Sequence, residues 1–279
     1  MIAPDMFTFT SRLHYHGKLV FTSAHRIGAE RSLDVTAPDL PILQTVDGLP
    51  YIPGSSFKGA WRAYTEAILR TVQVQHNLGE KLACDPLTEN GRCLPQKHVS
   101  DIKNTYRDDQ KKLDETLRTD SCLICRVFGN GHLASKVLIK DLIIQPDSFY
   151  RTEIRDGVAI DRDSGRAADG MKYQFETVPA GAAFDLEILV ENASSAELGV
   201  ALMGLLAFQR GEVLLGGAKS RGLGWCELQP NWEASEYVIP ENLLAYALRS
   251  DMAASQGVAE ATRTGWLKDL ETAIREGKV

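Results

Sequence analysis

The chain has 279 residues, of which 44% are hydrophobic and 24% charged, and its net charge is −6. This composition is that of an ordinary folded protein, and the length allows one elaborated domain or two small ones. No apolar run reaches the ~18 residues of a membrane span, and the first residues lack the pattern of a secretory signal. The sequence therefore predicts a cytoplasmic protein. Its acidity argues against a loose, nonspecific nucleic-acid binder that works alone, although residues 51–140 carry an excess of Lys and Arg.

The first half of the chain predicts a strand followed by a helix. Polar and apolar residues alternate over 7–13 and again over 19–21, which indicates a strand or hairpin. A helix with Ser55 or Ser56 as its N-cap is predicted after Pro53-Gly54. Its apolar stripe recurs every three or four positions, at Phe57, Trp61, Tyr64, Ile68 and Val72. Two cations of the first turns, Lys58 and Arg62, lie on one face, where a helix start favours anions. Solvated cations on an amphipathic helix fit the pattern equally well.

A polar segment at residues 76–135 contains four cysteines, namely Cys84, Cys93, Cys122 and Cys125. The pair 122/125 has the C-x-x-C spacing with which two thiolates grip one tetrahedral Zn²⁺, and the pair 84/93 is looser. Disulfides are disfavoured in a reducing compartment. We therefore predict an insertion with a structural zinc site, with free thiols as the alternative. Cys226, in an apolar strand, is predicted to be a small core residue.

The second half of the chain predicts the remaining strands and helices. Strands are expected at 137–144, 184–190 and 224–228, an apolar helix at 196–208 capped by Ser194 or Ser195, and a solvent-exposed hairpin within 145–182. Two helices, 240–250 and 259–276, form a C-terminal appendix. The coarse order is β, α, β, β, α, β. This is the ferredoxin-like plan shared with RNA-recognition domains, so the predicted fold class is α+β.

The stretch LLGGAKSRGLGWCEL, residues 214–228, combines glycines with cations. Glycine lets a backbone approach another chain closely, and interleaved cations suit a phosphate backbone. The spacing does not fit a P-loop, because Gly217 stands where the motif requires lysine. A phosphate-binding loop and an ordinary turn both fit the stretch.

Four stretches carry a resemblance to a known family. They are IPGSSFKGAWR (52–62), CRVFGN (125–130), IDRDSGRAADG (160–170) followed by ETVPAGAAF, and LLGGAKSRGLGW (214–225). They resemble, in family order, motifs of the RAMP superfamily, specifically of the repeated backbone subunit of type III CRISPR-Cas effector complexes of the Csm and Cmr types. The four-cysteine insertion is not universal in that family and suggests a zinc-containing, type III-D-like branch.

The resemblance implies a domain organisation and partners. Residues 1–229 would form an RRM-like core, with the zinc insertion at 76–135 and a thumb hairpin at about 145–182, and residues 230–279 would form a helical extension. Such subunits stack in a filament with other effector subunits along a CRISPR guide RNA and bind complementary target RNA. The guide backbone would be held by Ser55, Ser56, Lys58 and Arg62 and cradled by Gly216, Gly217, Lys219, Ser220, Arg221 and Gly222. The thumb would cross the guide–target duplex.

The resemblance also implies a catalytic residue. In active subunits, an aspartate in a D-x-P-[IV] context precedes the I-P-G-S-S motif, and this chain has Asp39-Leu40-Pro41-Ile42 there. Asp34 and Asp47 flank it but do not precede x-P-I. Asp39 would make the chain a metal-dependent endoribonuclease, using a divalent cation such as Mg²⁺, in which the target's 2′-OH attacks the adjacent phosphorus. His25, upstream in the same loop, is either an assistant or a core residue.

Other functions fit parts of the pattern. Some family members lack the aspartate and are noncatalytic guide-RNA scaffolds. A CRISPR RNA processing enzyme belongs to the same superfamily but relies on other motifs. From a different class, a zinc-stabilised enzyme could bind a small phosphorylated ligand through the glycine loop, yet the sequence offers no acid–base pair for it.

Overall fold

The computed structural model describes residues 8–30, 38–79, 81–148, 151–249 and 257–278. The strands are β1 (Arg12–Phe21), β2 (Tyr51–Ile52), β3 (Val137–Ile139), β4 (Leu142–Ile143), β5 (Glu153–Ile160), β6 (Ala167–Thr177), β7 (Ala183–Glu191) and β8 (Cys226–Val238). The helices are α1 (Gly54–Gln75), α2 (Gln96–Thr105), α3 (Gln110–Thr119), α4 (Leu123–Phe128), α5 (Ser195–Gln209), α6 (Pro240–Ala247) and α7 (Glu260–Arg275), with 3₁₀ turns η1 (Pro146–Ser148) and η2 (Lys219–Arg221).

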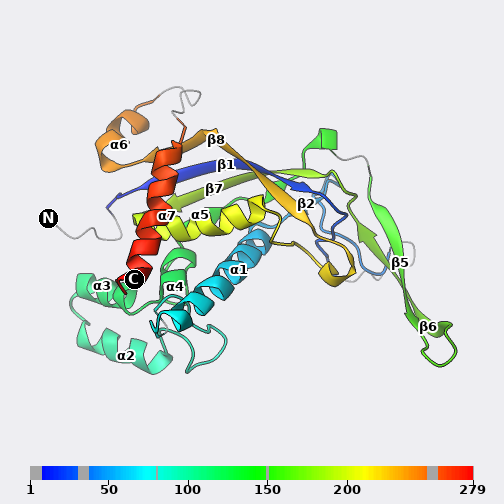
Figure 1. The fold of residues 1–279 in the computed structure, drawn as a ribbon, viewed down its shortest axis with the longest axis horizontal. Coiled ribbons are helices and arrows are strands. Elements are labelled where there is room, and N and C mark those ends of the chain that lie inside the picture. The colour runs from blue at the N-terminus through cyan, green and yellow to red at the C-terminus, as the bar shows by residue number, and fades with distance from the viewer. Residues whose placement is uncertain (1–7, 31–37, 80, 149–150, 250–256, 279) are drawn as a thin grey trace.

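An antiparallel sheet with the strand order β3-β7-β1-β8 forms one layer of the molecule. Helices α1 and α5 cover one face of this sheet (Figure 1). Along the chain, α1 lies between β1 and β3, and α5 lies between β7 and β8. The fold is therefore α+β, and its central elements follow the predicted order of strands and helices.

The alternation of side chains along β1 decides which face of the sheet the helices cover. Tyr15, Leu19 and Phe21 are completely buried toward the helices, and because successive side chains of a strand point to opposite faces, His14 and His16 lie on the other face. Gly17 leaves room for the ring of Tyr15, since a Cβ there would lie 2.8 Å from the tyrosine hydroxyl. Strand β1 begins at Arg12. The prediction of a strand from residue 7 was therefore wrong for residues 8–11, and Phe7 lies outside the described residues.

Helix α1 differs from the prediction in its cap and in its buried face. It begins at Gly54, whose N–H donates to Asp141 Oδ1 at 2.8 Å. The prediction of Ser55 or Ser56 as the N-cap was therefore wrong, and both serines are exposed within the first turn.

The buried face of α1 repeats every four residues, at Phe57, Trp61, Thr65, Leu69 and Gln73. Of the predicted stripe, only Phe57 and Trp61 lie on the buried face. That face continues through the polar residues Thr65 and Gln73, which can be buried because they have hydrogen-bond partners there. The Thr65 hydroxyl donates to the Trp61 carbonyl, and the Gln73 amide bonds with the backbone of Leu82 and Ala83.

The predicted strand at 137–144 is divided into β3 and β4. The break falls at Lys140 and Asp141, where the Asp141 side chain turns to cap α1. After the break, β4 pairs with β2 instead of β7. The last sheet strand, β8, continues to Val238, well past the predicted end at Leu228.

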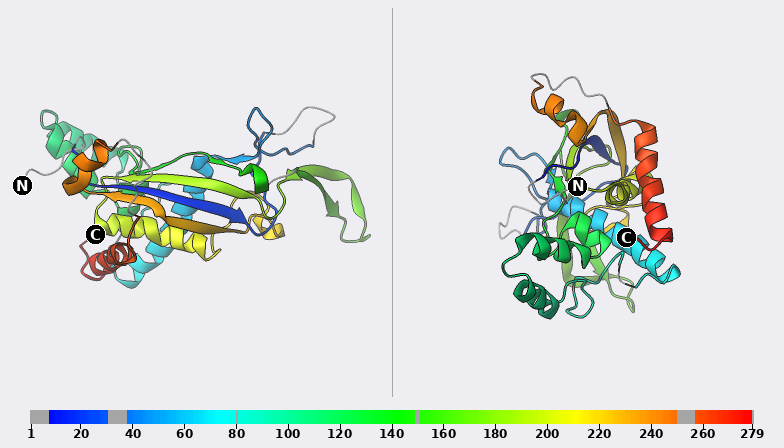
Figure 2. Two further views of the ribbon diagram at one scale, coloured as in Figure 1. Left: turned by 90° about the horizontal axis from the view of Figure 1, so that it is seen from above. Right: turned by 90° about the vertical axis from the view of Figure 1, so that its left-hand side faces the viewer.

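The two ends of the molecule are built differently. The hairpin β5–β6, with its turn at 161–166, projects beyond one end of the sheet, and helices α2 and α3 lie at the opposite end (Figures 1 and 2). Helix α7 packs against α5 so closely that a Cβ on Gly199 would lie 2.4 Å from the Trp266 carbonyl oxygen. Among the described residues, no helix is both long and apolar enough to cross a membrane.

Candidate nucleic-acid interface and metal centre

A cavity of about 660 Å³ lies between the first turns of α1 and the glycine loop. Its lining includes five residues that the sequence proposed as RNA contacts, namely Ser55, Ser56, Gly216, Gly217 and Lys219. Small side chains of α1 keep it open, at Gly59, Ala60 and Ala63. The fold therefore brings the helix-start motif and the glycine loop together in one hollow of the surface.

The glycine loop packs tightly against the segment that follows β1. Gly216 has a φ of +89°, and a Cβ there would lie 2.4 Å from the Arg26 carbonyl oxygen, which also accepts a hydrogen bond from the Gly217 N–H at 2.8 Å. The close approach that the glycines permit is thus, in part, an approach to the chain's own backbone. It leaves Lys219, Ser220 and Arg221 exposed on η2.

Arg26 is a cavity residue that sequence reasoning did not single out. It lines the cavity beside Gly217, and its guanidinium donates to the Pro41 carbonyl at 3.4 Å. Burial lowers the pKa of Arg26, and its Nε is buried with no hydrogen-bond partner in the described part of the chain. Its place depends on the pairing of residues 24–26 with 217–224, a long-range contact that leaves no local signal in the sequence.

Lys58 and Arg62 do not line the cavity. Lys58 donates to Ser135 Oγ at 2.7 Å and to the Val137 carbonyl at 3.1 Å. Arg62 donates to the Gly129 carbonyl at 2.9 Å and pairs with Glu66 at 2.7 Å. Burial, and next the charge of Arg62, lower the pKa of Lys58. Both cations therefore join α1 to the segment between α4 and β3, and a phosphate contact by either one stays a prediction.

Asp39 lies at the base of the projecting hairpin. Its Oδ2 accepts the Gln174 N–H of β6 at 2.8 Å, and the Leu40 N–H donates to the Gln174 carbonyl at 3.1 Å. The neighbouring β6 residue, Tyr173, accepts a hydrogen bond from Arg221 of η2 at 2.5 Å. Two consecutive residues of one strand thus connect the predicted catalytic aspartate with the glycine loop. Asp34 lies outside the described residues.

His25 is a core residue. It is 1% exposed, stacks on Phe21 with ring centroids 3.5 Å apart, and meets the edge of Phe184. Burial lowers the pKa of His25 to about 3, so its imidazole is neutral near pH 7. The core interpretation is confirmed, and the alternative in which His25 assists at Asp39 is wrong because the ring is enclosed by apolar side chains.

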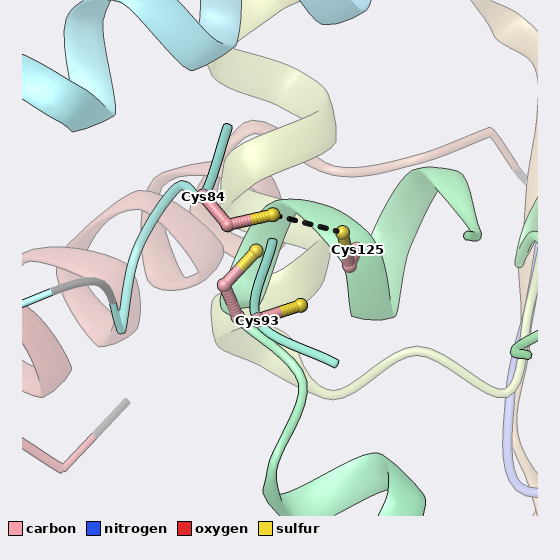
Figure 3. A group of neighbouring side chains, drawn as sticks. Cys84, Cys93 and Cys125 are labelled. Carbon is pink, nitrogen blue, oxygen red and sulfur yellow. Dashed lines mark hydrogen bonds between the residues drawn. The ribbon is translucent and has the colours of Figure 1, made fainter. Parts of the chain in front are cut away.

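The four predicted cysteines converge. The sulfur atoms of Cys84, Cys93, Cys122 and Cys125 all lie within 4.8 Å of one another, and those of Cys84 and Cys125 are 3.7 Å apart. Figure 3 shows three of these side chains directed toward a common point. In a tetrahedral site with Zn–S bonds of ~2.3 Å, sulfur atoms are ~3.8 Å apart. The cluster is therefore consistent with a zinc site.

The cysteine cluster is buried and has a cation beside it. Cys84, Cys122 and Cys125 are buried within the main core, and the Arg62 guanidinium lies 3.7 Å from Cys125 Sγ. A cation beside a buried thiolate offsets part of the cost of burying that charge. Cys226 lies apart, with its thiol donating to the Val213 carbonyl at 3.3 Å, and is the buried core residue that was predicted.

Comparison with known proteins agrees with these motifs. A model of the RAMP superfamily matches residues 7–227. The chain is similar to the CRISPR system Cms endoribonuclease Csm3 of Methanocaldococcus jannaschii, with 26% identity over 219 residues, 73% of this chain and 72% of that protein. It is also similar to the protein of the same name from Methanothermobacter thermautotrophicus, with 25% identity over 241 residues, 76% of this chain and 82% of that protein.

Proposed function

The chain belongs to the RAMP superfamily, and we propose from this premise that it is a backbone subunit of a type III CRISPR effector complex. In this role it binds guide RNA, stacks with other effector subunits and cleaves complementary target RNA. The observation that carries the proposal is the convergence of the helix-start motif and the glycine loop on one cavity. The similarity to two proteins named Csm3 endoribonucleases supports it.

The chemistry of the cavity suits an RNA backbone. Among the described residues, two cations, Arg26 and Lys219, and two hydroxyl groups, those of Ser55 and Ser56, line it, and no carboxylate does. Phosphate contacts in nucleic-acid complexes come mainly from such cations, hydroxyls and backbone N–H groups. Arg221, exposed on the adjoining turn, extends the positive surface toward the hairpin. We infer that the guide backbone follows this path, with Arg26 as an additional phosphate ligand.

Asp39 is proposed as the catalytic residue. RNA carries its own nucleophile, the 2′-OH, so the protein must position the target strand and hold or move a proton. The Gln174 N–H fixes one carboxylate oxygen of Asp39, which orients the group at the base of the hairpin. A divalent cation such as Mg²⁺, when bound, would stabilise charge on the phosphate. The products expected from this chemistry end in a 2′,3′-cyclic phosphate.

The other parts of the proposal follow the same premise. The core is a ferredoxin-like fold that includes β8 as far as Val238, so the extension expected from residue 230 begins only after that strand. The cysteine cluster holds structural zinc, as in a type III-D-like branch. The β5–β6 hairpin is the thumb, and its apolar side chains suit insertion between bases. Four of them are largely exposed, at Ile154, Val158, Ile160 and Met171.

Cleavage by the assembled complex tests the proposal. The complex is prepared with guide RNA and labelled complementary RNA, with and without Mg²⁺, and wild type is compared with Asp39→Ala. We expect discrete cuts from wild type and a loss of at least ~100-fold in rate from the variant, with RNA affinity unchanged. Asp47→Ala, in an exposed residue of the same loop, is the matched control and retains cleavage.

The alternative within the family is a noncatalytic scaffold. A wild-type complex that binds guide and target but never cuts would establish that role instead. Cleavage that survives in Asp39→Ala would place the catalytic group elsewhere. Failure to bind guide RNA would overturn the proposal as a whole.

A further inference from the structure

A second group of metal-ligating side chains lies on the open face of the sheet. His14 and His16 are on β1, and Glu187 is on β7 directly opposite His16 in the strand register. Side chains two apart on one strand share a face, and directly opposed residues on neighbouring strands have Cβ atoms ~5 Å apart. The pairing of β1 with β7 therefore places all three groups together, away from the helices.

The distances suit a small cation. The His14 Nε2 and Glu187 Oε1 atoms are 2.8 Å apart, and the His14 and His16 ring centroids are 4.2 Å apart. One ligand atom from each of the three residues lies within 4.8 Å of the other two. Ligand atoms ~2.1 Å from a tetrahedral zinc ion are ~3.4 Å from one another. The observed separations bracket that value, so small side-chain rotations suffice to close the site.

We propose that His14, His16 and Glu187 form a second divalent-metal site, of the class that binds Zn²⁺. Two imidazoles and one carboxylate are the ligand set of zinc sites that keep one position open. We expect that position to face a neighbouring cavity of about 520 Å³, which His16, Glu187, Gln229 and Asn231 help to line. A water molecule or a group from a bound partner completes the coordination.

Lys140 is the competitor for this site. Its Nζ contacts Glu187 Oε2 at 2.5 Å, and its side chain is 69% exposed. Because an exposed ion pair of this kind contributes little, the ammonium can withdraw into solvent when a dication binds. Glu187 Oε1, the oxygen near His14, is the one directed toward the imidazoles.

Metal content of the purified chain tests the proposal. The protein is equilibrated with low-micromolar free Zn²⁺, and bound zinc is measured by mass spectrometry for wild type, His14→Gln, His16→Gln and Glu187→Gln. We expect about two ions per chain in wild type, one in the cysteine cluster and one in this site, and a loss of about one ion in each variant. The matched control is His98→Gln, since His98 forms a similar 2.8 Å pair with Asp120 but is not part of a three-ligand group in the described chain.

Cobalt separates the two kinds of site. Co²⁺ bound by thiolates gives intense charge-transfer absorption, and a nitrogen–oxygen site adds only weak ligand-field bands. The variants of His14, His16 and Glu187 should lose the weak bands and retain the intense ones. Their melting temperature should equal that of wild type, because the cysteine-containing core is unchanged. The proposal is overturned if wild type binds no metal beyond the cysteine cluster, or if His14→Gln and His16→Gln bind as much zinc as His98→Gln.

Discussion

The cysteine end and the hairpin end of this molecule differ in how deeply their side chains are buried. In α4, which directly follows Cys122 and contains Cys125, all residues but one are buried. In β5, all residues but one are exposed. Buried side chains such as those of α4 stabilise the fold itself. Exposed apolar side chains on a strand pair are instead typical of a surface that binds another molecule. Substitutions at the first end should therefore alter stability, and substitutions at the second should alter binding.

Loss of a cysteine ligand should produce the largest effect. Structural zinc in small domains contributes ~10 kcal/mol or more of binding free energy to folding, so Cys125→Ser should lose zinc and at least ~3 kcal/mol of unfolding free energy. For a chain of this size, the melting temperature falls by at least about 5 °C. Zinc content and thermal unfolding measure both effects.

Cys226→Ala is the control for this prediction, because Cys226 is equally buried but remote from the cluster. Its small cavity should cost ~1 kcal/mol. If Cys125→Ser retained its zinc, or melted with Cys226→Ala, the cluster would not be the stabilising centre of its end of the molecule.

Acid should act next most strongly, through His25 at the base of the hairpin. The unfolded imidazole takes up a proton near pH 6.5, whereas burial lowers the folded pKa to about 3. The stability that is complete above pH 6.5 is therefore lost as pH falls toward 3, by ~1.4 kcal/mol per pH unit. Denaturant unfolding of wild type and His25→Phe across this range should show a shallower slope in the variant.

His98→Gln is the control for this prediction, since it removes a histidine from the surface and leaves the core unchanged. Equal slopes in wild type and His25→Phe would show that other groups dominate acid unfolding. In that case the base of the hairpin would behave in acid like its exposed outer part, and not like the core.

The smallest effect on stability is expected within the hairpin. A Cβ on Gly157 would lie 2.2 Å from the Tyr173 ring, so Gly157→Val should displace that ring from Arg221. Because Tyr173 is only half-buried and its neighbours Lys172 and Gln174 are exposed, the unfolding free energy should change by less than ~1 kcal/mol. Target-RNA binding or cleavage by the assembled complex should nevertheless weaken by several-fold.

The control for the hairpin is Gly131→Ala, where an added Cβ meets no atom within 4 Å. It should leave both stability and RNA binding at wild-type values. A Gly157→Val protein that lost stability but bound target normally would reverse the assignment of roles to the two ends.

Features with local causes were predictable from the sequence. The start of α5 is an example, since Ser194 and Glu197 form the reciprocal capping pair that their spacing suggests. The convergence of Cys122 and Cys125 follows from a single turn of chain. The order of the central strands and helices along the chain followed from their hydrophobic patterns.

Features with distant causes were not predictable. The cap of α1 is Asp141, a residue far along the chain that also divides a predicted strand in two. Lys58 and Arg62 had the residue types of phosphate ligands, but the segment at 129–137 supplies carbonyl and hydroxyl acceptors that turn them away from the cavity. Arg26 reached the cavity through the same kind of long-range pairing.

The backbone pairing of Leu40 with Gln174 and Glu176 has a geometric consequence. These bonds connect Asp39 with the inner part of β6, so we expect a tilt of the hairpin there to turn its carboxylate as well. The same bonds join Asp39 to β6 away from the tip of the hairpin. The hairpin can therefore grow or shrink by pairs of residues at its tip, changing its reach, while the position of the carboxylate stays fixed. The length of the hairpin and the position of the Asp39 carboxylate are thus set by different parts of β6.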